Sequence, residues 1–143
     1  MATTDGVSRP LICEWRDMLA VHARVWSVLE RELNDRHGLG ASEFEVLDHL
    51  LESTKPSWRV AELAQQLHLS PSALSRLIAR LEANDLVTRV MCPDDRRGIS
   101  VSLTDAGRAK HAEAVPTHCA VLAEHFVFPS TQAHSTQDNA VAN

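Results

Sequence analysis

The chain has 143 residues, of which 44% are hydrophobic and 23% are charged, so it is long enough and apolar enough to bury a hydrophobic core. It contains no apolar run as long as a membrane span, and residues 1–10 include an acid and no apolar segment, so we expect neither a membrane helix nor a signal peptide but a cytoplasmic protein. The formal net charge of −5 excludes bulk attraction as the means of holding a polyanion.

Apolar side chains at spacings of three and four predict one long helix over residues 10–36, which ends at His37 and Gly38 and follows a disordered N-terminus, residues 1–9. Its stripe consists of Leu11, Trp15, Met18, His22, Trp26, Leu29 and Leu33. At 1.5 Å per residue the helix is roughly 40 Å long, more than a small domain needs. We therefore expect part of it to pack against a second subunit.

Two shorter helices are predicted next. Ser42 and Glu45 have the spacing of a capping box and open a helix that buries Phe44, Leu47 and Leu51. After a break at residues 54–57, the apolar residues Val60, Leu63, Ala64 and Leu67 define a third helix. His68 and Leu69 then form a tight turn into the following helix, which gives a helix-turn-helix.

The helix over residues 70–81 has one apolar and one polar face. Ser70 is a good N-cap and Pro71 suits the first helical position. The buried stripe is Leu74, Leu77, Ile78 and Leu81, and the opposite face carries Ser72, Ser75, Arg76, Ala79 and Arg80. No acid occurs between Ser70 and Leu81, so a phosphate backbone can approach this face without repulsion.

A β-hairpin follows this helix. Val87, Arg89 and Met91 alternate with their neighbours, as do Ile99, Val101 and Leu103, which predicts two half-buried strands joined by a tip at residues 92–98. Residues 57–98 contain six Lys or Arg and five Asp or Glu, against eight and fourteen in the rest of the chain. The acidic charge therefore lies mostly outside the helix and hairpin.

The last predicted helix begins at the N-cap Thr104 and runs to about residue 128. Residues 129–143 have few apolar side chains, and we expect a weak or frayed segment there. The predicted fold is mainly α with a small β-wing. A winged helix-turn-helix domain, residues 41–103, is flanked by a helical dimerisation region made of residues 10–40 and 104–128.

The segments ELAQQLHLSPSALSRLIARLEANDLVTR and PDDRRGISVSLTDAGRA resemble the multiple antibiotic resistance regulator (MarR) family of bacterial winged-helix transcription factors. The likeness is specific over residues 60–108 and looser over residues 10–59. One departure is Asn84 and Asp85, where the family usually has glycine before the first wing strand. Another is the tail, which lacks the leucines of a crossing dimer helix.

The resemblance implies a homodimer on a pseudo-palindromic operator in double-stranded DNA, which represses transcription until a small aromatic effector or an oxidant weakens the complex. It places the 70–81 helix in the major groove, with Ser70, Ser72, Ser75, Arg76 and Arg80 as DNA-binding residues. It also places the wing in the minor groove, where Asp95 orients Arg97 and Arg96 lies beside it. We expect no cofactor.

Several other residues have two interpretations. Trp15, His22, Trp26 and Trp58 either fill the core, which we favour, or line an effector cleft between the dimerisation region and the winged helix-turn-helix domain. Cys13 and Cys92 are either inert thiols or redox sensors; the absence of tyrosine favours a buried, structural Cys13. His111, His118 and His125 recur every seven residues, a step too long for one ion, so a surface or interface row is favoured over a metal site.

No sequence motif predicts an enzyme. A glycine-rich phosphate loop, an HExxH motif and a Ser-His-Asp arrangement are all missing, and Asp94 and Asp95 lie on a basic turn that suits arginine orientation better than acid–base catalysis. Two alternatives to a ligand-responsive repressor stay open: a winged-helix protein-interaction module and a thiol-based redox regulator. The acid-free face of residues 70–81 argues for DNA, because a protein-binding wing would not need it.

Overall fold

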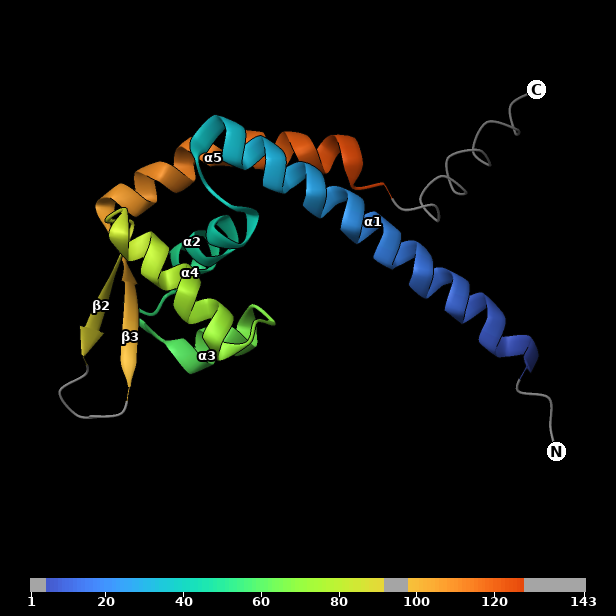
Figure 1. Ribbon diagram of the computed structural model, residues 1–143, viewed down its shortest axis with the longest axis horizontal. Helices are drawn as coiled ribbons and strands as arrows, with labels where there is room; N and C mark the ends of the chain where they lie inside the picture. Colours follow the sequence, from blue (N-terminus) through green and yellow to red (C-terminus); the bar gives the residue numbers. More distant parts are fainter. Residues whose placement is uncertain (1–4, 92–97, 128–143) are drawn as a thin grey trace, which may run out of the picture.

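The computed structural model describes residues 5–91 and 98–127, which form five helices and a three-stranded sheet (Figure 1). The elements in chain order are α1 (Asp5–His37), α2 (Ala41–Glu52), β1 (Trp58–Arg59), α3 (Val60–Gln66), α4 (Pro71–Ala83), β2 (Val87–Met91), β3 (Ile99–Leu103) and α5 (Asp105–His125). The predicted fold class, mainly α with a small β-wing, is confirmed. Within the described residues, no helix has the length and hydropathy needed to cross a membrane.

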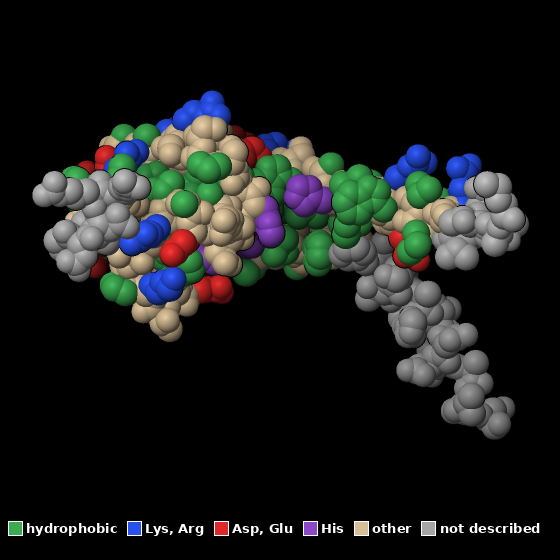
Figure 2. All heavy atoms as spheres, turned by 90° about the horizontal axis from the view of Figure 1, so that it is seen from below, with side chains coloured by type: hydrophobic (Ala, Val, Ile, Leu, Met, Phe, Trp, Pro, Cys, Tyr) green, Lys and Arg blue, Asp and Glu red, His purple; other side chains and the backbone are tan. Residues whose placement is uncertain are grey.

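Helix α1 has two halves with different environments. Its C-terminal half packs against α5 and buries Val21, Val25, Leu29 and Leu33. Its N-terminal half projects from the other elements as an arm (Figure 1), and apolar side chains are exposed along it (Figure 2). The exposed apolar residues are Leu11, Ile12, Trp15, Met18 and Leu19. The predicted stripe is therefore buried only in its second half.

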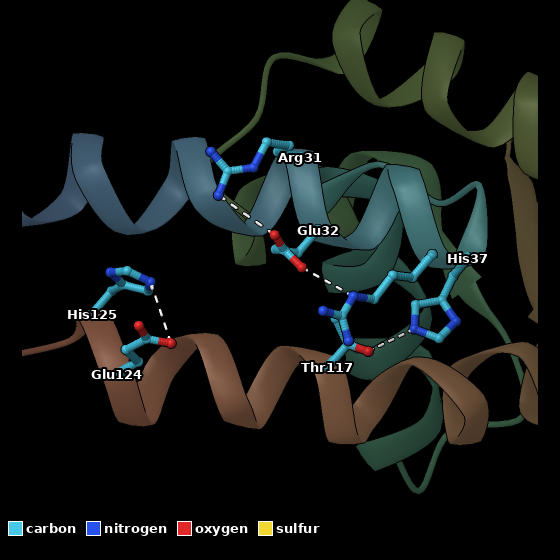
Figure 3. A network of polar contacts seen from close by, with 7 residues as sticks. Arg31, Glu32, His37, Thr117, Glu124 and His125 are labelled. Carbon is cyan, nitrogen blue, oxygen red and sulfur yellow. Dashed lines mark hydrogen bonds and ion pairs between the residues drawn. The ribbon is translucent and has the colours of Figure 1, made fainter.

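Polar contacts join α1 to α5, and Figure 3 shows the one between His37 and Thr117. The Nε2 atom of His37 lies 2.7 Å from the Thr117 hydroxyl oxygen, and Arg24 donates a hydrogen bond of 3.5 Å to the carbonyl of His125. At the other end, α1 starts at Asp5, so the prediction that residues 5–9 are disordered is wrong. The helix continues through Pro10, which the pattern placed at the first helical position but which is the sixth residue of α1.

The capping box predicted for α2 is wrong. The N-cap is Gly40, and it makes no side-chain cap hydrogen bond. Instead, the Glu30 carboxylate of α1 accepts a hydrogen bond of 3.0 Å from the backbone N–H of Ala41. A side chain from another helix thus does the work of the cap, which local spacing could not reveal.

The helix-turn-helix is confirmed. The turn between α3 and α4 contains His68, which has a φ of 54°. The Ser70 hydroxyl then accepts a hydrogen bond of 3.2 Å from the backbone N–H of Ala73 and caps α4. The predicted apolar stripe of α4 is buried at all four positions, Leu74, Leu77, Ile78 and Leu81.

The hairpin is confirmed, but its strands are less buried than the alternation predicts. The strand order is β1-β3-β2, with both neighbouring pairs antiparallel, and the two-residue β1 was too short for a period-2 pattern to reveal. Val87 and Val101 are buried, whereas Met91 and Ile99 are exposed. The two exposed residues are paired at the outer end of the hairpin, where the wing extends past the helices that cover its base.

Close backbone packing joins the wing to α5. The Thr104 hydroxyl donates to the carbonyl of Asp85 over 2.6 Å and accepts from the N–H of Gly107 over 3.0 Å, so the predicted N-cap is confirmed. Asp85, and not Asn84, has the left-handed backbone, with a φ of 58°. A Cβ atom on Gly107 would lie 2.1 Å from the carbonyl oxygen of Leu86. Only glycine fits this contact.

We therefore predict that Gly107→Ala lowers the free energy of unfolding by about 2 kcal/mol, because Leu86 and Leu103 must move to admit the methyl group. Urea denaturation followed by circular dichroism measures the change. Gly98→Ala is the matched control, since the nearest atom to its Cβ would be 3.7 Å away. Equal stability of the two variants would contradict the packing described at this joint.

Candidate nucleic-acid interface

The polar face of α4 is exposed because the opposite face is fixed in the core. Ser72, Ser75, Arg76, Ala79 and Arg80 are all exposed, while Leu74 and Leu81 are fully buried. The face contains hydroxyl groups, small side chains and two guanidinium groups. Such a surface can enter the major groove of DNA and donate hydrogen bonds to base edges and phosphates.

The two arginines of α4 have different surroundings. The Arg80 Nε atom lies 3.6 Å from the carboxylate of Glu43, whose side chain is mostly covered by α2 and its neighbours. Within the described residues, Arg76 has no carboxylate at ion-pair distance. Arg76 is therefore the arginine of this face that can be directed wholly to an outside partner, and Arg80 is tied to α2.

Ser70 is the N-cap of α4, in addition to any contact that it makes with DNA. Its hydroxyl oxygen accepts the capping hydrogen bond from Ala73 and lies 3.3 Å from the Ser72 hydroxyl. The sequence prediction named Ser70 as a DNA-binding residue, and the structure places it at the exposed first turn of α4.

The predicted wing residues Asp95, Arg96 and Arg97 lie outside the described residues, as does Cys92. The strands that carry them are described, and β2 packs beside α4. Two arginines at the base of the wing, Arg59 and Arg89, were not predicted as site residues. They line a groove of about 360 Å³ between α4 and the wing. The charge of this region was a usable signal, but the strand pattern assigned Arg89 to a half-buried position.

An apolar cleft of about 450 Å³ lies between α1 and α5. Two of the four predicted cleft residues, His22 and Trp26, line it, with their rings stacked at a centroid distance of 5.8 Å. The complete lining is Met18, Val21, His22, Val25, Trp26, Leu29, Glu45, His118, Leu122 and Phe126. Figure 2 shows histidine and apolar side chains gathered where the α1 arm leaves the body.

Trp15 and Trp58 are not part of this cleft. Trp15 is 56% exposed on the arm of α1, so core packing is wrong for it as well. Trp58 is half-buried in β1, where its Nε1 atom donates a 2.7 Å hydrogen bond to the Ser53 hydroxyl and Lys55 lies 4.3 Å above its ring. The sheet pairing of Trp58 with Val101 holds it away from α1.

Cys13 and the histidine row also differ from expectation. Cys13 is exposed, so its interpretation as a buried structural residue is wrong; it lies on the arm of α1, which no other element of the described residues covers. His111 and His118 do not form a surface row. They stack on opposite sides of Phe44, at centroid distances of 5.0 and 4.3 Å, because α2 packs against α5.

The buried His111 also has a polar partner on α2. Its Nε2 atom lies 2.6 Å from the Asp48 carboxylate, while His118 lies 3.5 Å from Glu45. These pairs and the Phe44 stack hold α5 against α2. Among the described residues, no three His, Cys, Asp or Glu side chains are grouped closely enough to hold a metal ion.

The model of the MarR family matches residues 37–98 of this chain. The HTH-type transcriptional repressor MdtR of Bacillus subtilis (strain 168) is 32% identical over 97 residues, which are 68% of this chain and 61% of MdtR. The match thus spans less than two thirds of the length of that relative.

Two solved structures from Streptomyces coelicolor cover most of the chain. AbsC, a MarR family transcriptional regulator, has 32% sequence identity and a TM-score of 0.74, over 93% of this chain and 88% of AbsC. Sco3205, a MarR family transcriptional regulator solved in complex with DNA, has 27% identity and a TM-score of 0.77, over 95% of this chain and 86% of Sco3205.

Proposed function

Because the chain belongs to the MarR family, we propose that it is a DNA-binding transcriptional regulator that acts as a homodimer. The observation that carries the proposal is the exposed, acid-free face of α4, fixed beside a β-wing by the buried stripe of the same helix. The complex of Sco3205 with DNA supports this function by relationship. A family of transcriptional regulators also agrees with the expectation that the chain is not an enzyme.

In the proposed complex, α4 enters the major groove and the wing reaches the adjacent minor groove. Ser72, Ser75 and Arg76 contact bases or phosphates, and Arg76 is suited to a bidentate contact with guanine. Arg97, oriented by Asp95, reads the narrow minor groove through its negative potential, and Arg96 adds a phosphate contact. Arg80 contributes to the positive potential of this surface while it holds Glu43.

The exposed arm of α1 supports the homodimer. Its five large apolar side chains, which are between 39% and 60% exposed, form a face that a second copy of α1 would cover. The two residues that follow α5, Phe126 and Val127, are also exposed. A two-fold symmetric dimer through this face would present two copies of α4, as a pseudo-palindromic operator requires.

We further propose that the regulator is a repressor that responds to a small aromatic effector. The relative MdtR is named a transcriptional repressor, which supports repression over activation. The apolar cleft between α1 and α5 supports an effector, because its stacked His22 and Trp26 can receive a flat ring and Glu45 and His118 can bind a polar substituent. Cytoplasmic location stays a prediction.

Selection of bound sequences from random DNA by the purified protein tests the proposed function. We expect enrichment of one palindromic consensus, whose half-sites are about 10 base pairs apart from centre to centre. A consensus without two-fold symmetry would contradict the homodimer. Lack of any enrichment would contradict sequence-specific DNA recognition and favour the alternative function, a winged-helix protein-interaction module.

The two classes of arginine contact predict different mutant behaviour. Arg76→Ala should relax the choice at one base pair of each half-site, at a cost of about 1–3 kcal/mol on the selected operator. Arg97→Ala should weaken binding to operator and scrambled DNA alike and lower the salt dependence. Fluorescence anisotropy titrations on both duplexes measure the difference. Equal losses on both duplexes for both variants would contradict this division.

The dimer interface predicts the effect of one charge on the arm of α1. Leu19→Glu should shift the protein to monomers, because it introduces a carboxylate into the apolar face. Ala20→Glu, one residue further along the same exposed helix but pointing away from that face, should leave the dimer intact. Sedimentation velocity measures both. A dimeric Leu19→Glu variant would show that another surface holds the two copies together.

A further inference from the structure

The groove between α4 and the base of the wing has two cationic walls. Its sides are formed by Arg59 of β1, Ser75 of α4 and Arg89 of β2, with small or apolar residues between them. Figure 1 shows α4 beside the β2–β3 hairpin that forms the opposite side. Within the described residues, no acidic side chain lines the groove. It is thus a concave surface suited to an anion.

The framework of the sheet fixes where these arginines lie. Arg59 is paired with Ser100 and Arg89 with Val101, so they stand on the two outer strands on either side of β3 and project from opposite faces of the sheet. Both nevertheless line the groove, which lies at the sheet edge beside Gly98 and Ile99. The side chain of Arg59 passes beside Gly98: a Cβ atom placed there would lie 3.7 Å from Arg59 Nε. The two arginines are therefore held at the foot of the wing, next to the helix that faces DNA.

The proposed docking determines which anion meets this groove. When α4 lies in a major groove and the wing lies in the adjacent minor groove, one sugar–phosphate strand separates the two grooves of DNA. That strand must pass between α4 and the wing. The groove lined by Arg59 and Arg89 is the space between them.

We infer that this groove seats a backbone phosphate of DNA, with Arg59 and Arg89 as its cationic walls and the Ser75 hydroxyl as an additional donor. The inference rests on the proposed function and adds to it a sequence-independent anchor. Phosphate contacts of this kind fix the register and orientation of a protein on the duplex. The anchor would set how deeply α4 and the wing enter their grooves.

Glu82 has a regulatory place in this arrangement. Its carboxylate lies 3.5 Å from Arg89 Nε, and both side chains are partly exposed, at 45% for Glu82 and 36% for Arg89. In the free protein the Glu82 carboxylate is therefore paired with the same Arg89 guanidinium group that would bind the phosphate. DNA binding exchanges one anionic partner of Arg89 for another, so Glu82 weakens binding by competition.

The test measures binding to the selected operator and to a scrambled duplex over a range of salt concentrations. Arg59→Gln and Arg89→Gln should each weaken binding to both duplexes by roughly fivefold and lower the slope of log K against log salt by about 1. Arg31→Gln is the matched control, because Arg31 also lies 3.5 Å from one glutamate but on α1, outside the groove. Thermal unfolding verifies that each variant is folded.

A double-mutant cycle separates competition from general repulsion between Glu82 and DNA. Glu82→Gln should tighten binding by roughly threefold in the natural chain and have little effect when Arg89 is already Gln. The inference is overturned if the wild-type protein binds DNA but both groove variants keep the affinity and salt slope of Arg31→Gln. A wild-type protein without salt-sensitive DNA binding would instead contradict the proposed function itself.

Discussion

The burial of the apolar stripe of α4 is the constraint on which the rest of the structure depends. Leu74, Leu77, Ile78 and Leu81 are at most 7% exposed, and burial of each such side chain contributes about 1.5–3 kcal/mol. Because the four residues share one face, their burial fixes the rotation of the helix about its axis. The polar side chains then have to face solvent. The chemistry of the exposed face is thus a consequence of the packing of the hidden one.

The same core connects this face to the remainder of the chain. Thr104 and Gly107 join the base of the wing to α5 through the backbone of Asp85 and Leu86. Phe44, stacked between two histidines, holds α5 against α2, and α5 packs along α1. A change at the apolar cleft between α1 and α5 therefore adjoins the helices that position the proposed DNA-binding face. For the proposed effector, this continuity would be a physical route from the cleft to the DNA-binding face.

Local patterns predicted the elements well where one residue and its near neighbours determine the structure. The N-caps Ser70 and Thr104 and the stripe of α4 are of this kind. Patterns failed where a distant segment decides the outcome. Glu30 caps α2 from another helix, β1 is only two residues long, and the α1 stripe is apolar along its whole length although the subunit covers half of it. Arg59 and Arg89 were not predicted as site residues for the same reason, since only the folded sheet brings them beside α4.

In the proposed complex, α4 and the wing of each of two subunits bind adjacent grooves of one DNA duplex. Chemical footprinting of the complex with its selected operator tests this arrangement, because methylation of guanine N7 reports the major groove and methylation of adenine N3 reports the minor groove. We predict major-groove protection at two sites about one helical turn apart, each flanked on its outer side by minor-groove protection. Protection at a single site, or in the minor groove alone, would contradict the account.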